Sequence, residues 1–151
     1  MASTLVKLNI HLIFHVKITG VTLKKEMLPE LFQYIAGIIK NNGGIPIEIG
    51  GMPDHLHVLS TLPKTMALSD FARAIKANSS RWINDQPYYQ KRFSWQEGYG
   101  AFSVSPTLIE KTVNYIRTQE EHHKKRTFRD EYISFLKHYD IEFNKNYILD
   151  D

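Results

Sequence analysis

The first regular pattern along the chain is an alternation of apolar and polar positions between Lys7 and Lys17. Successive side chains of a β-strand point to opposite faces, so this spacing predicts a strand with two different faces. The apolar face holds Leu8, Ile10, Leu12, Phe14 and Val16. The other face holds Lys7, Asn9, His11, Ile13, His15 and Lys17. We therefore expect one buried face and one largely polar face.

The elements that follow alternate between helical and extended spacing. Apolar residues at helical intervals predict helices over residues 27–41 and 67–84. Apolar runs bounded by turn residues predict strands over residues 45–49 and 55–62, and an extended stretch within residues 92–104.

Two helices are predicted after the last extended stretch. Ser105 followed by Pro106 is typical of a helix start, and that helix extends to about residue 125. Thr127 with Asp130 resembles a capping box that opens a final helix over residues 128–139.

This order of elements predicts an α+β fold: a ferredoxin-like βαββαβ antiparallel sheet with helices on one face, plus two C-terminal helices. The polar face of the first strand agrees, because the other side of the sheet would stay open for a ligand or for the next helix to pack. The 151 residues suit one domain, 1–151.

Composition narrows the class of protein only slightly. The net charge of +3 and the pI near 9.0 favour an anionic partner without deciding it. The absence of cysteine excludes zinc ribbons, thiol catalysis and disulfide scaffolds. The first 17 residues lack the features of a signal peptide, and no apolar run approaches the ~20 residues of a spanning helix. We expect a soluble, cytoplasmic protein without a membrane partner.

His55 and His57 form the first candidate site. They follow a run dense in turn residues, 50–54, and stand at i and i+2 on a predicted strand, so both imidazoles point to the same side. Two imidazoles at this spacing can hold one divalent cation. Taken alone, the pair is also typical of two half-exposed strand histidines.

Tyr115 and Gln119 form the second candidate site. They stand at i and i+4 on one face of the predicted helix 106–125. A tyrosine phenol can act as a nucleophile, and a glutamine carbonyl oxygen is an acceptable ligand for a hard cation. Alone, they are more typical of a core tyrosine and a solvated glutamine. With the histidines, they supply the parts of a metal-assisted phosphoryl transfer.

Three blocks of sequence resemble a known family in the same order along the chain. Residues 52–58, MPDHLHV, resemble the histidine–hydrophobe–histidine motif of the HUH nucleases. Residues 94–100, SWQEGYG, and 115–119, YIRTQ, resemble two blocks of their single-tyrosine transposase branch. The resemblance covers nearly the whole chain.

The resemblance implies a small prokaryotic transposase of the insertion-sequence or REP-associated type. Such enzymes cut and rejoin single-stranded DNA at hairpin ends through a 5′-phosphotyrosine intermediate, use Mg²⁺ or Mn²⁺, and work as homodimers. By resemblance, Tyr115 is the nucleophile, and His55, His57 and Gln119 are the metal ligands. In many members the nucleophile helix acts in trans, beside the histidine pair of the other subunit.

Two groups of basic residues are candidates for DNA contact. Arg73, Lys76 and Arg81 on the helix 67–84 suit contacts to sugar and phosphate, although they also suit a solvated helix face. The second group follows Tyr115 and could instead complement a helix C-terminus. It comprises Lys124, Lys125 and Arg126.

Aromatic and histidine residues complete the candidates. Trp95, Tyr99 and Phe102 could stack on unpaired bases, although strand aromatics are more often core. The two histidines on the polar face of the first strand could supplement the site. The third histidine lies on the Tyr115 face of the predicted helix and is easily mistaken for a ligand. These are His11, His15 and His122.

Two other functions remain open at this point. A catalytically silent or domesticated protein would bind hairpins without cutting them. A metal phosphodiesterase would use water as the nucleophile, with Tyr115 in a structural role.

Overall fold

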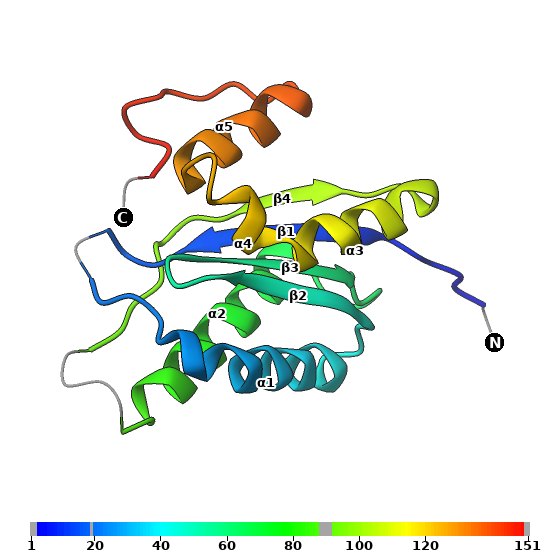
Figure 1. Cartoon of the computed structure of the whole chain (residues 1–151). Helices are drawn as coiled ribbons and strands as arrows, with labels where there is room; N and C mark the ends of the chain where they lie inside the picture. Colours follow the sequence, from blue (N-terminus) through cyan, green and yellow to red (C-terminus); the bar gives the residue numbers. More distant parts are fainter. Residues whose placement is uncertain (1–2, 19, 88–91, 150–151) are drawn as a thin grey trace.

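The computed structural model describes residues 3–18, 20–87 and 92–149. Among these, four strands form an antiparallel sheet with the order β2-β3-β1-β4 (Figure 1). The strands are β1 (Asn9–His15), β2 (Pro46–Met52), β3 (His55–Thr61) and β4 (Gly100–Ser103). This order belongs to the ferredoxin-like arrangement, so the predicted fold class is confirmed.

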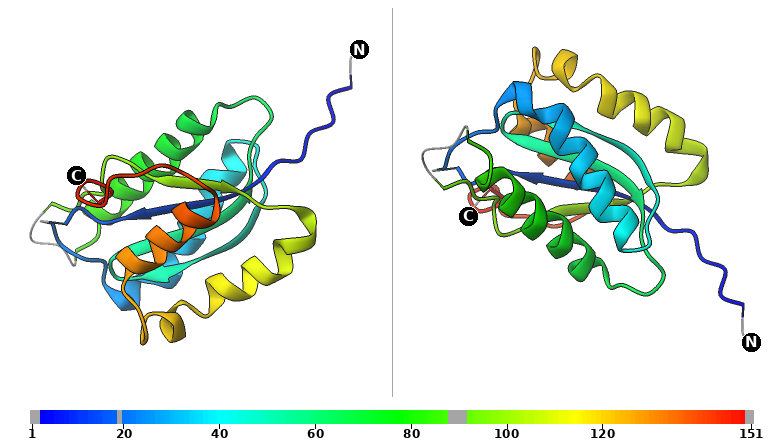
Figure 2. Two further views of the ribbon diagram at one scale, coloured as in Figure 1. Left: turned by 90° about the horizontal axis from the view of Figure 1, so that it is seen from above. Right: turned by 90° about the horizontal axis from the view of Figure 1, so that it is seen from below.

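Helices lie over both faces of the sheet. Helices α1 (Leu28–Asn41) and α2 (Leu68–Asn84) cover one face (Figure 2). A 3₁₀ turn, Lys25–Met27, leads into α1. The opposite face carries the C-terminal helices α3 (Ile109–Arg117), α4 (Gln119–His122) and α5 (Phe128–His138).

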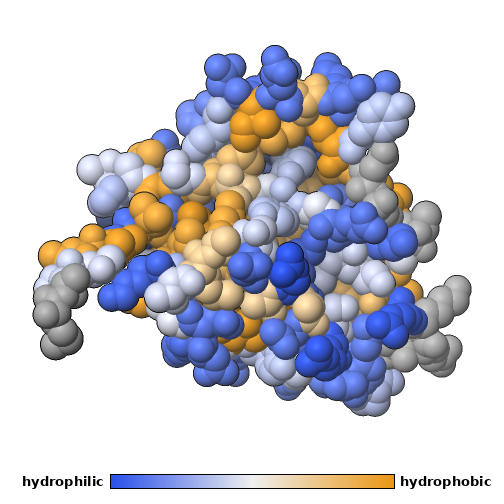
Figure 3. Space-filling model, turned by 180° about the vertical axis from the view of Figure 1, so that it is seen from behind, coloured by the Kyte–Doolittle hydropathy of each residue, from blue (hydrophilic) through white to orange (hydrophobic). Residues whose placement is uncertain are grey.

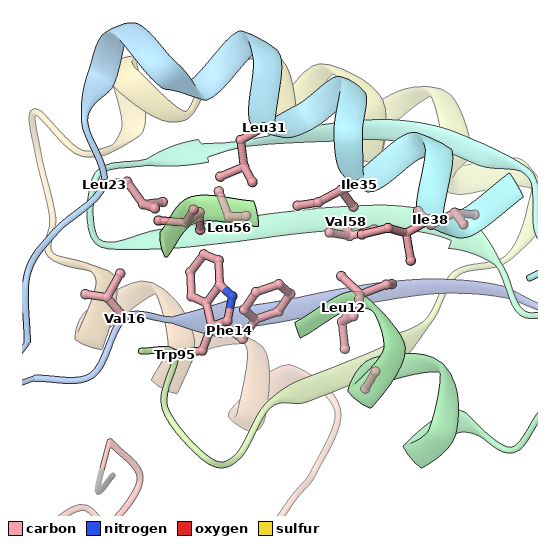
Figure 4. Packing of buried hydrophobic residues seen from close by; sticks show 14 of the residues in the cluster. Leu12, Phe14, Val16, Leu23, Leu31, Ile35, Ile38, Leu56, Val58 and Trp95 are labelled. Carbon is pink, nitrogen blue, oxygen red and sulfur yellow. The ribbon is translucent and has the colours of Figure 1, made fainter. Parts of the chain in front are cut away.

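The main hydrophobic core lies between the sheet and the layer of α1 and α2. Apolar side chains of α1 at helical spacing point down onto the sheet, where they meet Leu12 and Val58 (Figure 4). The α1 contribution includes Leu31, Ile35 and Ile39, each 0% exposed. This is the apolar face that the alternation of the first strand predicts.

The opposite face of β1 is also buried, because the C-terminal helices pack on it as one of the two expected uses of this face. All seven residues of β1 are buried, including His11 and His15. Ile13 and Phe102 pack against α5 through Phe128 and Tyr132. Conversely, Leu8 is 54% exposed, because it precedes the part of the strand that helices cover.

The β2–β3 hairpin turns later than the run of turn residues suggests. Strand β2 continues through Gly50 and Gly51 to Met52, and the turn consists of Pro53 and Asp54. A Cβ atom on Gly50 would lie 2.8 Å from both Cγ2 and the carbonyl oxygen of Ile116. The glycine therefore serves close packing of α3 on β2 rather than a turn.

The predicted helix 106–125 is divided into three parts. A 3₁₀ turn, Pro106–Leu108, precedes α3, and the helix breaks at Thr118 before α4. The Thr118 hydroxyl donates to the carbonyl oxygen of Asn114 at 2.9 Å, a bond that competes with regular helix geometry. Tyr115 thus lies on α3, and Gln119 lies on the next short helix, α4.

The N-terminal arm before β1 is apolar and exposed. Leu5 and Val6 are 93% and 47% exposed, and the arm leads away from the body of the protein (Figures 1 and 3). None of the described helices is long and apolar enough to cross a membrane.

Candidate active site

The histidine pair lies on the central strand β3, beneath the C-terminal helices. His55 and His57 are both 0% exposed, and their ring centroids are 5.2 Å apart. Leu56 and Val58 point into the core on the other side of the sheet. The prediction that both imidazoles share one face is confirmed.

Helix α5 adds a carboxylate, Glu131, that the sequence analysis missed. Its Oε1 atom lies 3.0 Å from His57 Nε2 and 3.5 Å from His55 Nε2, and the residue is 0% exposed. One ligand atom from each of these three residues lies within 4.8 Å of the others. A signal for Glu131 exists, since it interrupts the apolar stripe of Phe128, Tyr132 and Phe135 on α5.

Gln119 lies at the same point, as its spacing predicts. Its Oε1 atom is 2.9 Å from His55 Nε2. Its amide nitrogen donates to Glu131 Oε2 at 3.3 Å and to the Tyr115 carbonyl oxygen at 3.4 Å. These two donor contacts fix the amide so that its oxygen faces the histidines.

His122, the last residue of α4, and His123, which follows it, have different surroundings. His122 stacks on Tyr115, with ring centroids 4.5 Å apart, and its Nε2 atom lies 3.0 Å from the Thr118 hydroxyl. His123 reaches the cluster instead: its Nε2 atom is 3.2 Å from Gln119 Oε1. His123 was not among the candidate ligands predicted from the sequence.

The Tyr115 hydroxyl lies against the same cluster. It donates a hydrogen bond to Glu131 Oε2 and accepts one from Arg126 Nη2 at 3.3 Å. Burial and the contact with Glu131 raise the pKa of the Tyr115 phenol above its usual value, and the Arg126 guanidinium opposes this effect. The tyrosine ring also lies 5.8 Å from the His57 ring, centroid to centroid.

The buried groups differ in charge. Burial lowers the pKa of His57, although Glu131 opposes this effect. Burial and then His57 lower the pKa of His11, whose Nε2 atom lies 2.7 Å from His57 Nδ1. Burial works to raise the pKa of Glu131, but the contacts with His57 and Tyr115 outweigh it and hold that pKa well below its usual range. Neutral imidazoles and an ionised carboxylate are the forms that bind metal ions.

These donors suit a divalent cation. Imidazole nitrogens, a carboxylate oxygen and an amide oxygen meet within one buried site, and such mixed nitrogen and oxygen sets hold first-row divalent ions. Asp54 Oδ1 lies 2.7 Å from His55 Nδ1, so a carboxylate orients this imidazole from behind. Ligating histidines in proteins are commonly held in this way.

The second basic group lies beside the cluster. Lys124, Lys125 and Arg126 line a cavity of about 560 Å³ together with Asp54 and His123. Arg126 also lines a second cavity of about 200 Å³, which Tyr115 borders as well.

The first basic group lies on α2, on the other face of the sheet. Arg73 forms an exposed ion pair with Asp70 at 3.2 Å, and Arg81 is exposed. The Lys76 ammonium donates to three successive carbonyl oxygens, those of residues 96, 97 and 98, at 2.6, 2.8 and 3.0 Å. Lys76 therefore anchors the loop of residues 96–98. Lys76 and Arg73 both line a cavity of about 450 Å³ next to this loop.

The remaining candidates are divided between the core and the site. Trp95 and Phe102 are 8% and 3% exposed and belong to hydrophobic clusters, so they take the core role that strand aromatics more often have rather than stacking on bases. Tyr99 is half-buried and lines the cavity beside α2. Of the two strand histidines, His11 contacts the site through His57, whereas His15 lies against Phe128 with ring centroids 5.5 Å apart.

Comparisons with known proteins give a consistent result. Residues 4–119 match the family model described as "Transposase IS200 like". The ISDra2 transposase TnpA of Deinococcus radiodurans is 28% identical over 120 residues, which cover 76% of this chain and 86% of that protein.

Two solved structures are similar to this chain. A crystal structure of a transposase from Deinococcus radiodurans R1 has a TM-score of 0.59 and 26% identity, over 79% of this chain and 95% of its own. A REP-associated tyrosine transposase bound to a REP hairpin has a TM-score of 0.59 and 17% identity, over 82% of this chain and 73% of its own. At 17% identity, the second likeness is one of fold.

Proposed function

Because the chain belongs to the IS200-like transposase family, we propose that it cuts and rejoins single-stranded DNA at hairpin ends through a covalent bond between Tyr115 and a 5′-phosphate. The observation that carries this proposal is the position of the Tyr115 hydroxyl. It contacts Glu131, which in turn contacts His57, within one chain.

Tyr115 acts as the nucleophile. Its hydroxyl gives up its proton towards Glu131 Oε2, and its oxygen forms a bond to phosphorus while the bond from phosphorus to the 3′-oxygen breaks. The leaving 3′-oxygen takes a proton from water, which leaves a 5′-phosphotyrosine and a free 3′-OH. Glu131 of α5 and Arg126, which lies between α4 and α5, both contact the hydroxyl and hold it in place for attack. Rejoining is the reverse reaction with a 3′-OH as the attacking group.

His55, His57 and Glu131 would hold Mg²⁺ or Mn²⁺, with the amide oxygen of Gln119 beside them. The bound ion supplies neutralisation and polarisation of the phosphate that is attacked. The chain itself keeps these donors dry and oriented, because all four residues are at most 2% exposed.

The DNA contacts follow the basic residues. Lys124, Lys125 and Arg126 line a cavity next to His123, where they can bind the phosphates on either side of the cut. Arg73 and Arg81 lie on α2 and would contact DNA farther away. Lys76 remains a candidate, although its ammonium already has three carbonyl partners.

The assembly we propose is a homodimer that acts on DNA in the cytoplasm of a prokaryote. The nucleophile and the histidine pair lie together within one chain, so a catalytic centre does not need a nucleophile helix from the other subunit. Dimerisation would then serve to hold two DNA ends.

The experiment is incubation with single-stranded DNA that carries the element's own hairpin end, with Mn²⁺, followed by denaturing electrophoresis. A covalent protein–DNA adduct is expected, and Tyr115→Phe should abolish it. Tight binding without cleavage under any divalent metal would instead indicate a hairpin-binding module. Free products without an adduct would indicate a phosphodiesterase that uses water.

A further inference from the structure

Four polar atoms converge in the buried site. Oε1 of Gln119 lies 2.9 Å from His55 Nε2 and 3.2 Å from His123 Nε2. Oε1 of Glu131 lies 3.5 Å and 3.3 Å from the same two nitrogens. Two imidazole nitrogens and two oxygens therefore face one another.

The hydrogen-bond partners of both histidines fix the direction of their ring nitrogens. His55 Nδ1 lies 2.7 Å from a carboxylate oxygen of Asp54, which accepts, so Nδ1 carries the hydrogen. His123 Nδ1 lies 3.1 Å from the carbonyl oxygen of Arg126, which also only accepts. In the neutral form that binds a metal ion, each ring then directs the lone pair of its Nε2 atom into the cluster.

The oxygens of the cluster cannot supply hydrogens to these lone pairs. The amide nitrogen of Gln119 donates in another direction, to Glu131 Oε2 and to the Tyr115 carbonyl oxygen. A set of lone pairs that face one another within a buried site is stabilised by a cation at its centre.

The distances between the donor atoms agree with metal coordination. For metal–ligand distances of about 2.0–2.3 Å, neighbouring ligands of one ion lie about 3–3.5 Å apart. The separations between imidazole nitrogens and the two oxygens run from 2.9 to 3.5 Å, and His57 Nε2 lies 3.0 Å from Glu131 Oε1.

We propose that His123 is a metal ligand, so that three imidazoles, the Gln119 amide and the Glu131 carboxylate form one donor set. His123 and Glu131 both lie beyond residue 119, where the match to the family model ends. The adjacent His122, which stacks on Tyr115, is not a ligand. This inference shares one premise with the proposed function, namely that the protein binds a divalent metal ion.

The donor set also determines the preferred ion. Imidazole nitrogens favour transition metals, whereas Mg²⁺ prefers oxygen ligands. A set with three imidazoles should therefore bind Mn²⁺ more tightly than Mg²⁺.

The test compares His123→Phe with His122→Phe in the full chain without DNA. Both changes keep an aromatic ring and remove the nitrogens. Calorimetric titration with Mn²⁺ should show an affinity about 10–100-fold lower for His123→Phe and one within about twofold of wild type for His122→Phe. His123→Gln serves as a second variant, and thermal melting without metal confirms that each protein is folded.

A spectroscopic measurement separates ligation from a structural effect. Pulsed electron paramagnetic resonance of bound Mn²⁺ should detect ¹⁴N couplings from three imidazoles in the wild type and from two in His123→Phe. Equal Mn²⁺ affinity and equal couplings in the two proteins would overturn the proposal, as would a wild type that binds no Mn²⁺. A wild type that binds Mn²⁺ through three imidazoles and forms no DNA adduct would support this inference and contradict the proposed function.

Discussion

The Tyr115 ring lies 5.8 Å from the His57 ring of the same chain, centroid to centroid, and Glu131 contacts both side chains. Helix α3 brings the tyrosine to the sheet, strand β3 brings the histidine, and α5 closes over them with the carboxylate. One chain thus contains the complete constellation that the proposed reaction requires.

This arrangement predicts the outcome of a mixing experiment. A mixture of Tyr115→Phe and His57→Ala proteins should form no DNA adduct, because neither chain holds both groups. Denaturing electrophoresis of the mixture, beside the wild type at equal concentration, provides the measurement. Restored adduct formation would indicate a nucleophile helix that acts across two subunits.

The close approach of α3 to β2 predicts the effect of a single methyl group. Gly50→Ala places a Cβ atom 2.8 Å from Ile116, one residue after Tyr115, so α3 must shift. We expect a loss of about 1–3 kcal/mol in the free energy of unfolding and a slower rate of adduct formation.

Gly37→Ala is the matched control for this change. Nothing lies within 4 Å of a Cβ atom built on Gly37, which stands inside α1. It should raise the free energy of unfolding by about 0.5–1 kcal/mol and leave the reaction unchanged. Equal stability of both variants, measured by urea unfolding, would contradict the packing argument.

The three basic residues after α4 should differ in their effects. Arg126 contacts the Tyr115 oxygen, so Arg126→Ala should lower the rate of adduct formation at saturating DNA about 10–100-fold, as expected for loss of one charge-assisted hydrogen bond. Lys124→Ala and Lys125→Ala should mainly weaken DNA binding and reduce the salt slope by about 0.7 per lost phosphate contact.

Single-turnover rates and anisotropy titrations at several salt concentrations separate these effects. Arg129→Ala is a suitable control, because that guanidinium donates to the Lys145 carbonyl oxygen instead. If Arg126→Ala formed the adduct at the normal rate but bound DNA with a reduced salt dependence, Arg126 would bind phosphate and have no role at the Tyr115 oxygen.

The metal-free protein should lose stability in mildly acidic solution. The pKa values of His11 and His57 are lowered in the fold from the usual 6.5, so the unfolded chain binds more protons below that pH. The free energy of unfolding should therefore fall as the pH decreases from 7.5 to 5.5, by up to about 1.4 kcal/mol per pH unit for each histidine. Glu131 does not contribute to this change, because its lowered pKa confines its effect to pH values near and below 4.5.

Urea unfolding in the presence of a chelator, at pH 7.5 and 5.5, measures this dependence. His11→Gln should show a smaller change with pH, since the amide can still bond to His57 Nδ1 and does not titrate. The same pH dependence in His11→Gln and wild type would show that His11 is not responsible. Added Mn²⁺ should reduce the loss at pH 5.5.

Local patterns predicted the sheet and the histidine pair. The alternation along β1 and the i, i+2 spacing of His55 and His57 depend on strand geometry alone, and both are confirmed. Gly50 and Gly51 were misassigned to a turn, because two glycines in sequence do not reveal the helix that packs against them.

Glu131 and His123 carry weaker signals in the sequence than the histidine pair does. Glu131 is 74 residues from His57 in the chain, and the two meet only because α5 crosses the face of the sheet. His123 contacts Gln119 at the i, i+4 spacing that also links Gln119 to Tyr115, so a signal for it was present within the predicted helix 106–125. Only Glu131 depends on packing between distant segments.

The central claim, that Tyr115 forms the covalent bond to DNA, is tested most directly by mass spectrometry of the adduct. Trypsin cleaves after Lys111 and Arg117, which releases residues 112–117 with Tyr115 as their one tyrosine. After nuclease trimming, this peptide should carry the mass of a 5′-phosphonucleotide on Tyr115. A nucleotide on any other peptide, or its absence from all peptides despite cleaved DNA, would contradict the claim.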